Sequence, residues 1–171
     1  MEALPATPFI LIHDPVSSCQ NDGTLSWEFV RAAIAEGKVS RLVRTPEQTA
    51  IYEAFRVETA ARYASTFDRV IERVFGYPAL PTAGCGKLAV QIPEPRGTRL
   101  VLRPNDFPYN LASGLRHDVL WSEGGPLDEV AIAAYIALNF AGHETLHFVN
   151  PPALQSVPTI FHVHIISRPQ R

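Results

Sequence analysis

The sequence predicts an α+β fold in which a largely antiparallel four- to five-stranded sheet packs with one long and two shorter helices. Three observations lead to this prediction. Helix start signals and three- and four-residue apolar spacing fill residues 24–76, whereas short alternating apolar runs dominate residues 87–167. The length of 171 residues fits one domain. We therefore expect an irregular N-terminal arm over residues 1–23 and a single α+β domain over residues 24–171.

The helices are expected from their start and stop signals. Ser26 is an N-cap candidate for a short first helix that Gly37 ends. The segment Thr45-Pro46-Glu47-Gln48 combines a cap, a proline at the first helical position and a glutamine that can bond back to the cap. Because no proline or glycine follows until Gly76, we expect one long helix there, with or without a kink. A third helix is expected over residues 127–140.

The strands are expected where apolar and polar residues alternate. These runs cover residues 87–92, 98–103, 117–122, 145–149 and 159–167. The segment Pro93-Glu94-Pro95-Arg96-Gly97 lies between the first two runs and predicts a hairpin connection.

Composition narrows the class of function. The chain has 15 basic and 17 acidic residues and a formal net charge of −2, so neither DNA nor an anionic membrane is an expected partner. No apolar run reaches the roughly 20 residues of a membrane span. Cys19 and Cys85 are too few for a four-cysteine metal site. We expect a cytoplasmic protein that needs no metal and no other cofactor.

One segment matches a zinc-binding pattern. His143-Glu144-Thr145-Leu146-His147 fits HExxH, which places two histidines one turn apart on a helix. Here β-favouring residues make up the motif and prolines follow it, so a strand is expected instead. In a strand, histidines four residues apart are roughly 13 Å apart, too far for one ion. We interpret the match as chance and expect no metal site.

His162 and His164 are two residues apart in a predicted strand, so both side chains should project from one face. A histidine-triad signature would need a third histidine at position 166, where this chain has Ile166. This weakens the hypothesis that the protein is a histidine-triad hydrolase. The simplest alternative is two histidines that are hydrogen-bonded on a half-buried strand face.

Other polar residues could complete a site around these histidines. Asp106 and Tyr109 lie in a proline-containing loop, and His117 begins the next strand. Arg99 and Arg103 share one strand face, where they could hold a phosphate or form ordinary ion pairs. The remaining candidates keep two interpretations each. Trp121 could floor a pocket or fill the core, and Lys38, Arg41 and Arg44 could contact a phosphate backbone or form a solvated connector.

Five segments carry a resemblance to a known family. They are residues 25–30 (LSWEFV), 41–46 (RLVRTP), 103–110 (RPNDFPYN), 117–121 (HDVLW) and 154–157 (LQSV). Across residues 24–168 the chain resembles the fungal family of N-acetylglucosamine-induced proteins, which also contains the arginine-containing cyclodipeptide synthases. The resemblance implies a cofactor-free enzyme that condenses arginine from arginyl-tRNA with a residue from a second aminoacyl-tRNA.

Such a reaction needs a base, donors to an oxyanion and a carboxylate for the arginine side chain. We expect His164 or His162 to be the base, with Asp106 orienting a histidine or accepting the guanidinium. Tyr109 and His117 are the expected oxyanion donors, and Asp118 and Glu123 are reserve anions. Further expected roles are substrate contact by Arg103, Asn105 and Trp121, and tRNA binding by Lys38, Arg41, Arg44, Arg96 and Arg99.

The alternative is a non-catalytic or sugar-phosphate-binding protein of N-acetylglucosamine metabolism. In that case Arg99 and Arg103 would hold the phosphate.

Overall fold

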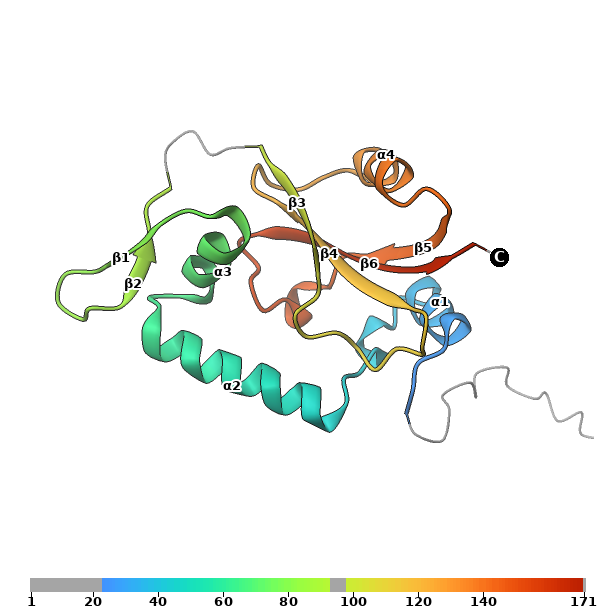
Figure 1. Ribbon diagram of the computed structural model, residues 1–171, viewed down its shortest axis with the longest axis horizontal. Coiled ribbons are helices and arrows are strands. Elements are labelled where there is room, and N and C mark those ends of the chain that lie inside the picture. The colour runs from blue at the N-terminus through green and yellow to red at the C-terminus, as the bar shows by residue number, and fades with distance from the viewer. Residues whose placement is uncertain (1–22, 93–97, 171) are drawn as a thin grey trace, which may run out of the picture.

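The computed structural model describes residues 23–92 and 98–170. The predicted arm, except for Gly23, and the predicted connection over residues 93–97 lie outside these ranges. The described residues form an α+β structure, as the sequence predicts. Figure 1 shows helix α4 (Glu129–Asn139) on one side of a central sheet and helices α2 (Pro46–Arg62) and α3 (Thr66–Phe75) on the other. No helix in the described ranges is long and apolar enough to cross a membrane.

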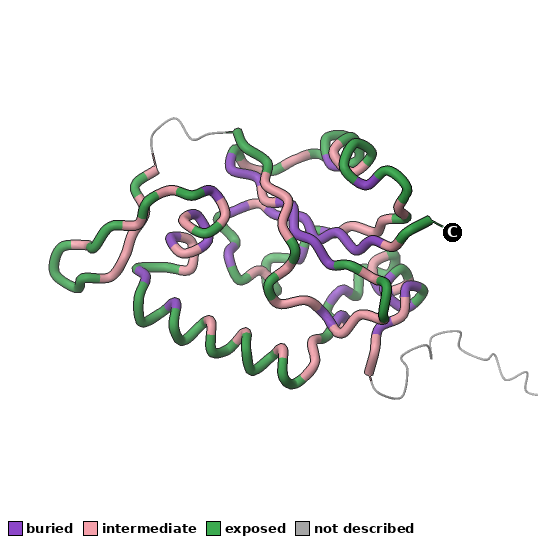
Figure 2. The backbone as a smooth tube through the Cα atoms, in the orientation of Figure 1, coloured by how far each residue is buried: buried purple, intermediate pink, exposed green. Residues whose placement is uncertain are grey.

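The central sheet has four antiparallel strands in the order β3-β4-β6-β5. They are β3 (Leu100–Pro104), β4 (Arg116–Ser122), β5 (His143–Phe148) and β6 (Phe161–Pro169). The two central strands, β4 and β6, contain most of the buried positions of this sheet, which Figure 2 shows in purple. Because they are covered on both faces, polar groups on them are held away from water.

The register sorts the side chains onto two faces. One face, here called the cavity face, carries Val101, Arg103, His117, Val119, Trp121, His162, His164, Ile166, Leu146 and Phe148. Helix α1 (Trp27–Ala35) covers one end of it through a cluster that includes Phe148 and Ile166. Helix α3 (Thr66–Phe75) covers the other end against Trp121. The histidines lie between these two covered ends.

The opposite face carries an apolar cluster at its centre. Leu120, Val163 and Ile165 are fully buried there. They pack with Ile132 of helix α4 (Glu129–Asn139). Asp128 caps this helix by accepting a hydrogen bond from the Ala131 N–H, so the helix begins after the residue expected from the sequence.

The expected long helix is two helices, which corrects the prediction. Ser26 caps α1 and Thr45 caps α2 (Pro46–Arg62), as predicted. The chain then leaves the helix at Tyr63, and Ser65 caps α3 by accepting a hydrogen bond from the Asp68 N–H at 3.2 Å. A serine with an acid three residues later is a helix start signal that needs neither proline nor glycine. The break turns α3 onto the sheet and leaves α2 beside it.

The predicted hairpin between residues 87–92 and 98–103 is also wrong. Strand β2 (Leu88–Val90) pairs with β1 (Ala79–Pro81), and β3 pairs with β4. The turn between β1 and β2 is closed by hydrogen bonds from the Thr82 N–H and hydroxyl to the Lys87 carbonyl, and Gly84 and Gly86 supply left-handed backbone. Two short 3₁₀ segments, Val39–Arg41 and Pro152–Leu154, complete the described structure.

Candidate functional site

A cavity of about 540 Å³ lies between the cavity face and helices α2 and α3. We call it the main cavity. Asn105, Asp106 and Phe107 line it from the loop after β3, and His162 and His164 line it from β6. The two segments are far apart in sequence, and the sheet register brings them together because Arg103, Val119 and His164 are neighbours across three strands.

Two of the histidines form a buried hydrogen-bonded chain. His117 Nε2 lies 3.0 Å from His164 Nδ1, and His164 Nε2 lies 2.9 Å from the amide nitrogen of Asn150. Burial lowers the pKa of His117 to about 3, and burial together with the nearby His117 holds the pKa of His164 well below its usual range. Both imidazoles are therefore neutral at physiological pH, so in their contact one donates and the other accepts.

The Asn150 side chain fixes the direction of this chain. Its amide oxygen is buried without a hydrogen-bond partner among the described residues, while its nitrogen faces His164. Rotating the amide by half a turn removes the orphaned oxygen and lets it accept from His164 Nε2–H. His164 Nδ1 then accepts from His117 Nε2–H, and His117 Nδ1 accepts from the backbone N–H of Tyr109 at 3.4 Å. We assign these tautomers because each of these three contacts then pairs one donor with one acceptor.

His162 has a different environment. Its Nδ1–H donates to the Ile160 carbonyl at 2.8 Å, and its ring stacks on Trp121 with centroids 4.7 Å apart. Because Nδ1 carries the proton, Nε2 is an acceptor, and it makes no hydrogen bond within the described residues. Burial lowers the pKa of His162, so the ring is neutral. Of the three histidines, this is the one with a proton-accepting nitrogen not already engaged.

His117 and Tyr109 do not line the main cavity. The Tyr109 ring stacks on His117 with centroids 4.7 Å apart, and both are buried in the layer behind the wall. Burial raises the pKa of Tyr109. The expectation that these two groups donate to an oxyanion is therefore corrected: they support His164 from behind.

Asp106 is placed to bind a guanidinium rather than a histidine. Its carboxylate receives two hydrogen bonds from Arg73, at 3.1 Å and 3.3 Å, and none from a described histidine. Asn105 takes the place beside the histidine, with its amide nitrogen 3.1 Å from His117 Nε2 and its oxygen accepting from the Phe107 N–H. Arg103 and Trp121 both line the cavity, as expected of substrate-contacting residues.

The two reserve anions lie elsewhere, which corrects that expectation. Asp118 points to the opposite face of the sheet and pairs with Arg116 at 3.2 Å. Glu123 pairs with Arg99 at 2.8 Å beside a second hollow of about 190 Å³, and Arg99 holds the pKa of this carboxyl below its usual range. Of the two interpretations of Arg99, the structure shows the ion pair.

The expected tRNA-binding stripe is not one surface. Lys38 and Arg41 both pair with Glu36 near α1, whereas Arg99 lies against Phe75 at the far end of the sheet. Arg44 alone of this set lines the main cavity. Arg96 falls outside the described residues. These residues belong to segments that the fold places apart, so they do not form one surface.

Several cavity residues were missed in the sequence. They are Arg56, Arg69 and Arg73 on α2 and α3, together with Asn150, Gln155 and Ser156. Arg69 and Arg73 are four residues apart and so share a helix face, a signal that was present but hidden in the expected long helix. Asn150 precedes Pro151 and lies two residues after the end of β5, the position of a loop polar group that follows a strand.

The HExxH segment is a strand, as predicted. His143 and His147 lie on β5, and His147 contacts Glu129 of α4 at 2.6 Å. Within residues 23–92 and 98–170, no group of three or more histidine, cysteine or acidic side chains could hold a metal ion.

Comparison with known proteins gives three findings. The family model described as "Protein of unknown function (DUF3605)" matches residues 26–168. A relative from Saccharomyces cerevisiae (strain ATCC 204508 / S288c), "Uncharacterized protein YPL067C", is 30% identical over 161 residues, which cover 82% of this chain and 77% of that protein. The crystal structure of HTC1 is similar with a TM-score of 0.54 and 27% identity, and the alignment covers 86% of each chain.

Proposed function

The chain belongs to the family described as "Protein of unknown function (DUF3605)", and we propose that this member is a tRNA-dependent arginine-containing cyclodipeptide synthase. One observation supports the proposal above the others. Parts of segments 103–110, 117–121 and 154–157, which carry the resemblance to the fungal family that contains such enzymes, line one cavity together with His162 and His164 of β6. A cavity at the meeting point of distant segments is where an enzyme holds its reacting groups.

The proposed reaction needs no oxidant, metal or nucleotide. The α-amine of one aminoacyl ester attacks the ester carbonyl of the other, which forms a peptide bond and releases the first tRNA with a free 3′-terminal hydroxyl. The amine of the resulting dipeptidyl ester then attacks its own ester carbonyl and closes the six-membered ring, which releases the second tRNA. Each step transfers one proton from the amine to the departing oxygen, so one base that can also return a proton serves both.

His162 is our candidate for that base. His162 lines the cavity, its Nε2 is an unengaged acceptor, and burial keeps the ring neutral, so the nitrogen lone pair is free. Both nitrogens of His164 are engaged by His117 and Asn150, so His164 acts as a positioning residue. Gln155 lines the cavity and replaces Tyr109 and His117 as the candidate donor to the oxyanion.

Asp106 is our candidate for recognising the arginine side chain. It is the one carboxylate among the described residues that line the main cavity. It already binds a guanidinium, that of Arg73, through two hydrogen bonds, and a substrate arginine would make the same fork.

The direct test is incubation of the purified protein with arginyl-tRNA and a mixed aminoacyl-tRNA pool, with cyclic dipeptides detected by mass spectrometry. We expect an arginine-containing diketopiperazine. H162Q should lower turnover by about a hundredfold or more because it removes a proton acceptor. H147Q is the matched control, since His147 lies outside the cavity, and should retain full turnover. Ester hydrolysis without a cyclic product would contradict the proposed function. Full activity in H162Q would contradict the assignment of His162 as the base.

A second candidate is a protein that binds an amino-sugar phosphate. It is favoured by the charge of the cavity, where five arginines face one aspartate. A thermal shift with glucosamine 6-phosphate, and none with aminoacyl-tRNA, would favour this function over the first.

A further inference from the structure

We propose that the guanidinium groups of Arg44, Arg73 and Arg103 form a phosphate-binding subsite at the main cavity, and that it holds the phosphate of the tRNA's 3′-terminal nucleotide. We call it the phosphate subsite. The identity of the nucleotide rests on the proposed synthase function, whereas the phosphate chemistry rests on the arginines themselves.

The main cavity is strongly cationic in a chain whose formal net charge is −2. The arginines that line it come from three helical or loop segments and one strand, and they are Arg44, Arg56, Arg69, Arg73 and Arg103. Asp106 is the sole described carboxylate on the lining. Such a concentration of one sign in a concave, partly apolar site attracts and retains an anion.

Two of these arginines have no carboxylate partner within the described ranges. Arg56 pairs with Glu53 and Arg69 pairs with Glu58, each at 3.1 Å, so both are neutralised along α2 and α3. Arg44 and Arg103 instead donate to backbone carbonyls, those of Phe107 and Arg73. A carbonyl satisfies a donor but leaves the positive charge uncompensated. An incoming phosphate therefore gains the most favourable electrostatic interaction from Arg44 and Arg103.

The Arg44 guanidinium is already held in place. Its Nε donates to Phe107 at 2.9 Å, and its plane lies 4.8 Å from the Tyr52 ring centroid and 5.5 Å from that of Tyr109. These contacts fix the group before a ligand arrives, and little side-chain freedom is lost on binding. Arg99 is different, because the two oxygens of Glu123 already occupy its guanidinium.

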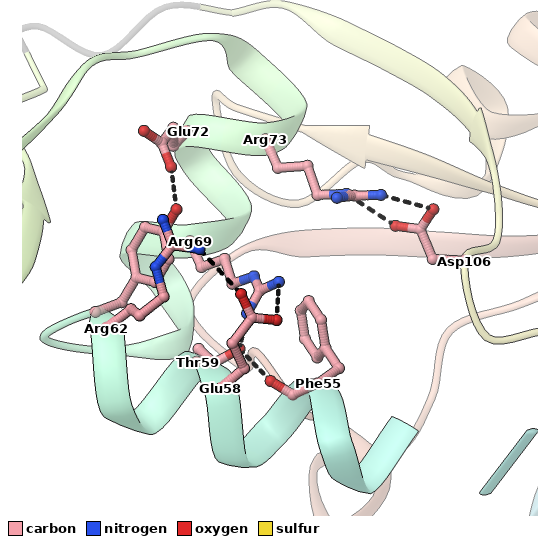
Figure 3. A network of polar contacts seen from close by, with 9 residues as sticks. Phe55, Glu58, Thr59, Arg62, Arg69, Glu72, Arg73 and Asp106 are labelled. Atoms are coloured by element: carbon pink, nitrogen blue, oxygen red, sulfur yellow. Dashed lines mark hydrogen bonds and ion pairs between the residues drawn. The ribbon is translucent and has the colours of Figure 1, made fainter. Parts of the chain in front are cut away.

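The third arginine links the subsite to substrate recognition. Figure 3 shows Arg73 of α3 reaching across to Asp106, apart from the Arg69–Glu58 network that joins α2 and α3. The side chains of Arg73 and Asp106 are 48% and 44% exposed, so this pair is weak and easily exchanged. A phosphate that takes over Arg73 would release Asp106 to accept the guanidinium of a substrate arginine. Phosphate and guanidinium binding should therefore favour each other.

The binding test uses isothermal titration calorimetry of the full chain with AMP, adenosine and glucosamine 6-phosphate. We expect AMP to bind at least tenfold more tightly than adenosine, and more tightly than glucosamine 6-phosphate. R103Q and R44Q should each weaken AMP binding by about ten- to a hundredfold because each removes charged hydrogen bonds. R62Q is the matched control and should bind like the wild type. Arg62 lies on α2, pairs with Glu58 and does not line the cavity.

The outcomes separate the subsite from the synthase function. If AMP binds no better than adenosine, or if R103Q and R62Q bind AMP equally, the phosphate subsite is refuted whatever the enzyme assay shows. Tighter binding of glucosamine 6-phosphate than of AMP refutes the nucleotide assignment. Arginine-dependent AMP binding in a protein that makes no cyclic dipeptide upholds the subsite and refutes the synthase. Should R44Q fail to fold, R103Q decides alone, since the Arg103 guanidinium makes one backbone contact.

Discussion

Acidification should destabilise this protein through its buried histidines. Burial lowers the pKa of His117 to about 3 and holds that of His164 well below its usual range, whereas both would have a pKa near 6.5 in the unfolded chain. Below pH 6.5 the unfolded chain therefore binds protons at these histidines that the folded chain does not bind. The contribution of each histidine to the free energy of unfolding is complete above pH 6.5 and is lost as the pH falls from there towards the folded pKa.

The size of the effect follows from this linkage. At about pH 5 the unfolded state gains about 2 kcal/mol for each histidine that stays neutral in the folded state. His117, with a folded pKa of about 3, gives about 2 kcal/mol, a sizeable share of the roughly 5–15 kcal/mol that stabilises an ordinary domain, and the lowered pKa of His164 adds to this loss in the same direction. This window lies above the usual pKa range of aspartate and glutamate near 4, so the histidines dominate it.

The assay is urea unfolding, followed by circular dichroism, between about pH 7.5 and about pH 5. The wild type should lose at least about 2 kcal/mol across this range, and H164L should lose less than the wild type because one buried imidazole is gone. I132V is the control, because Ile132 packs on the opposite face of the sheet. It should lower the free energy of unfolding by about 1 kcal/mol at every pH and leave the pH dependence unchanged.

Two results would refute this reasoning. A free energy of unfolding that stays constant between the two pH values would show that the folded state takes up the same protons as the unfolded chain. An H164L variant with the full wild-type pH dependence would show that His164 is not one of the groups responsible.

Three further predictions concern stability at neutral pH, each measured by urea unfolding. L120A should cost about 2–5 kcal/mol because Leu120 is fully buried under α4, and a loss below 1 kcal/mol would place the core elsewhere. S65A should cost about 1 kcal/mol because Ser65 caps α3, whereas an unchanged midpoint would mean that the cap is dispensable. G76A should cost about 1 kcal/mol through its backbone alone, since Gly76 has a φ of 75° and an added methyl group meets no atom within 4 Å; a stabilised G76A would contradict this.

The sequence predicted the structure best where all the interacting residues lie in one short segment. Ser26 and Thr45 cap helices because a side-chain oxygen bonds a backbone N–H three residues later, and both partners lie in the same segment. The Ser65 cap is equally local, and the long-helix prediction failed because the absence of glycine and proline was weighed above it. The two-residue spacing of His162 and His164 likewise placed them on one face, with ring centroids 5.5 Å apart.

The candidate site was predicted in part. The Asn105–Phe107 loop and the histidine strand share the main cavity, as expected from the loop position of Asp106 and the strand position of the histidines. The expected role of Asp118 failed because strand alternation sends it to the other face. Glu123 failed because Arg99 already engages it. Neither outcome could be predicted from residue type alone. Whether an acidic side chain is free to bind a substrate depends on the residues that surround it.

By itself, the sequence determined the α+β class, the helix starts and the face on which the histidines lie, because these depend on interactions between residues a few positions apart. Only the tertiary structure decided that Arg44, Arg73 and Arg103 line one cavity together with Asp106, and that Asn150 completes the buried histidine chain. Those contacts join residues 30 or more positions apart, such as Arg73 and Asp106, or depend on a neighbouring strand. Their formation is set by strand order and by the break between α2 and α3, which no single segment encodes.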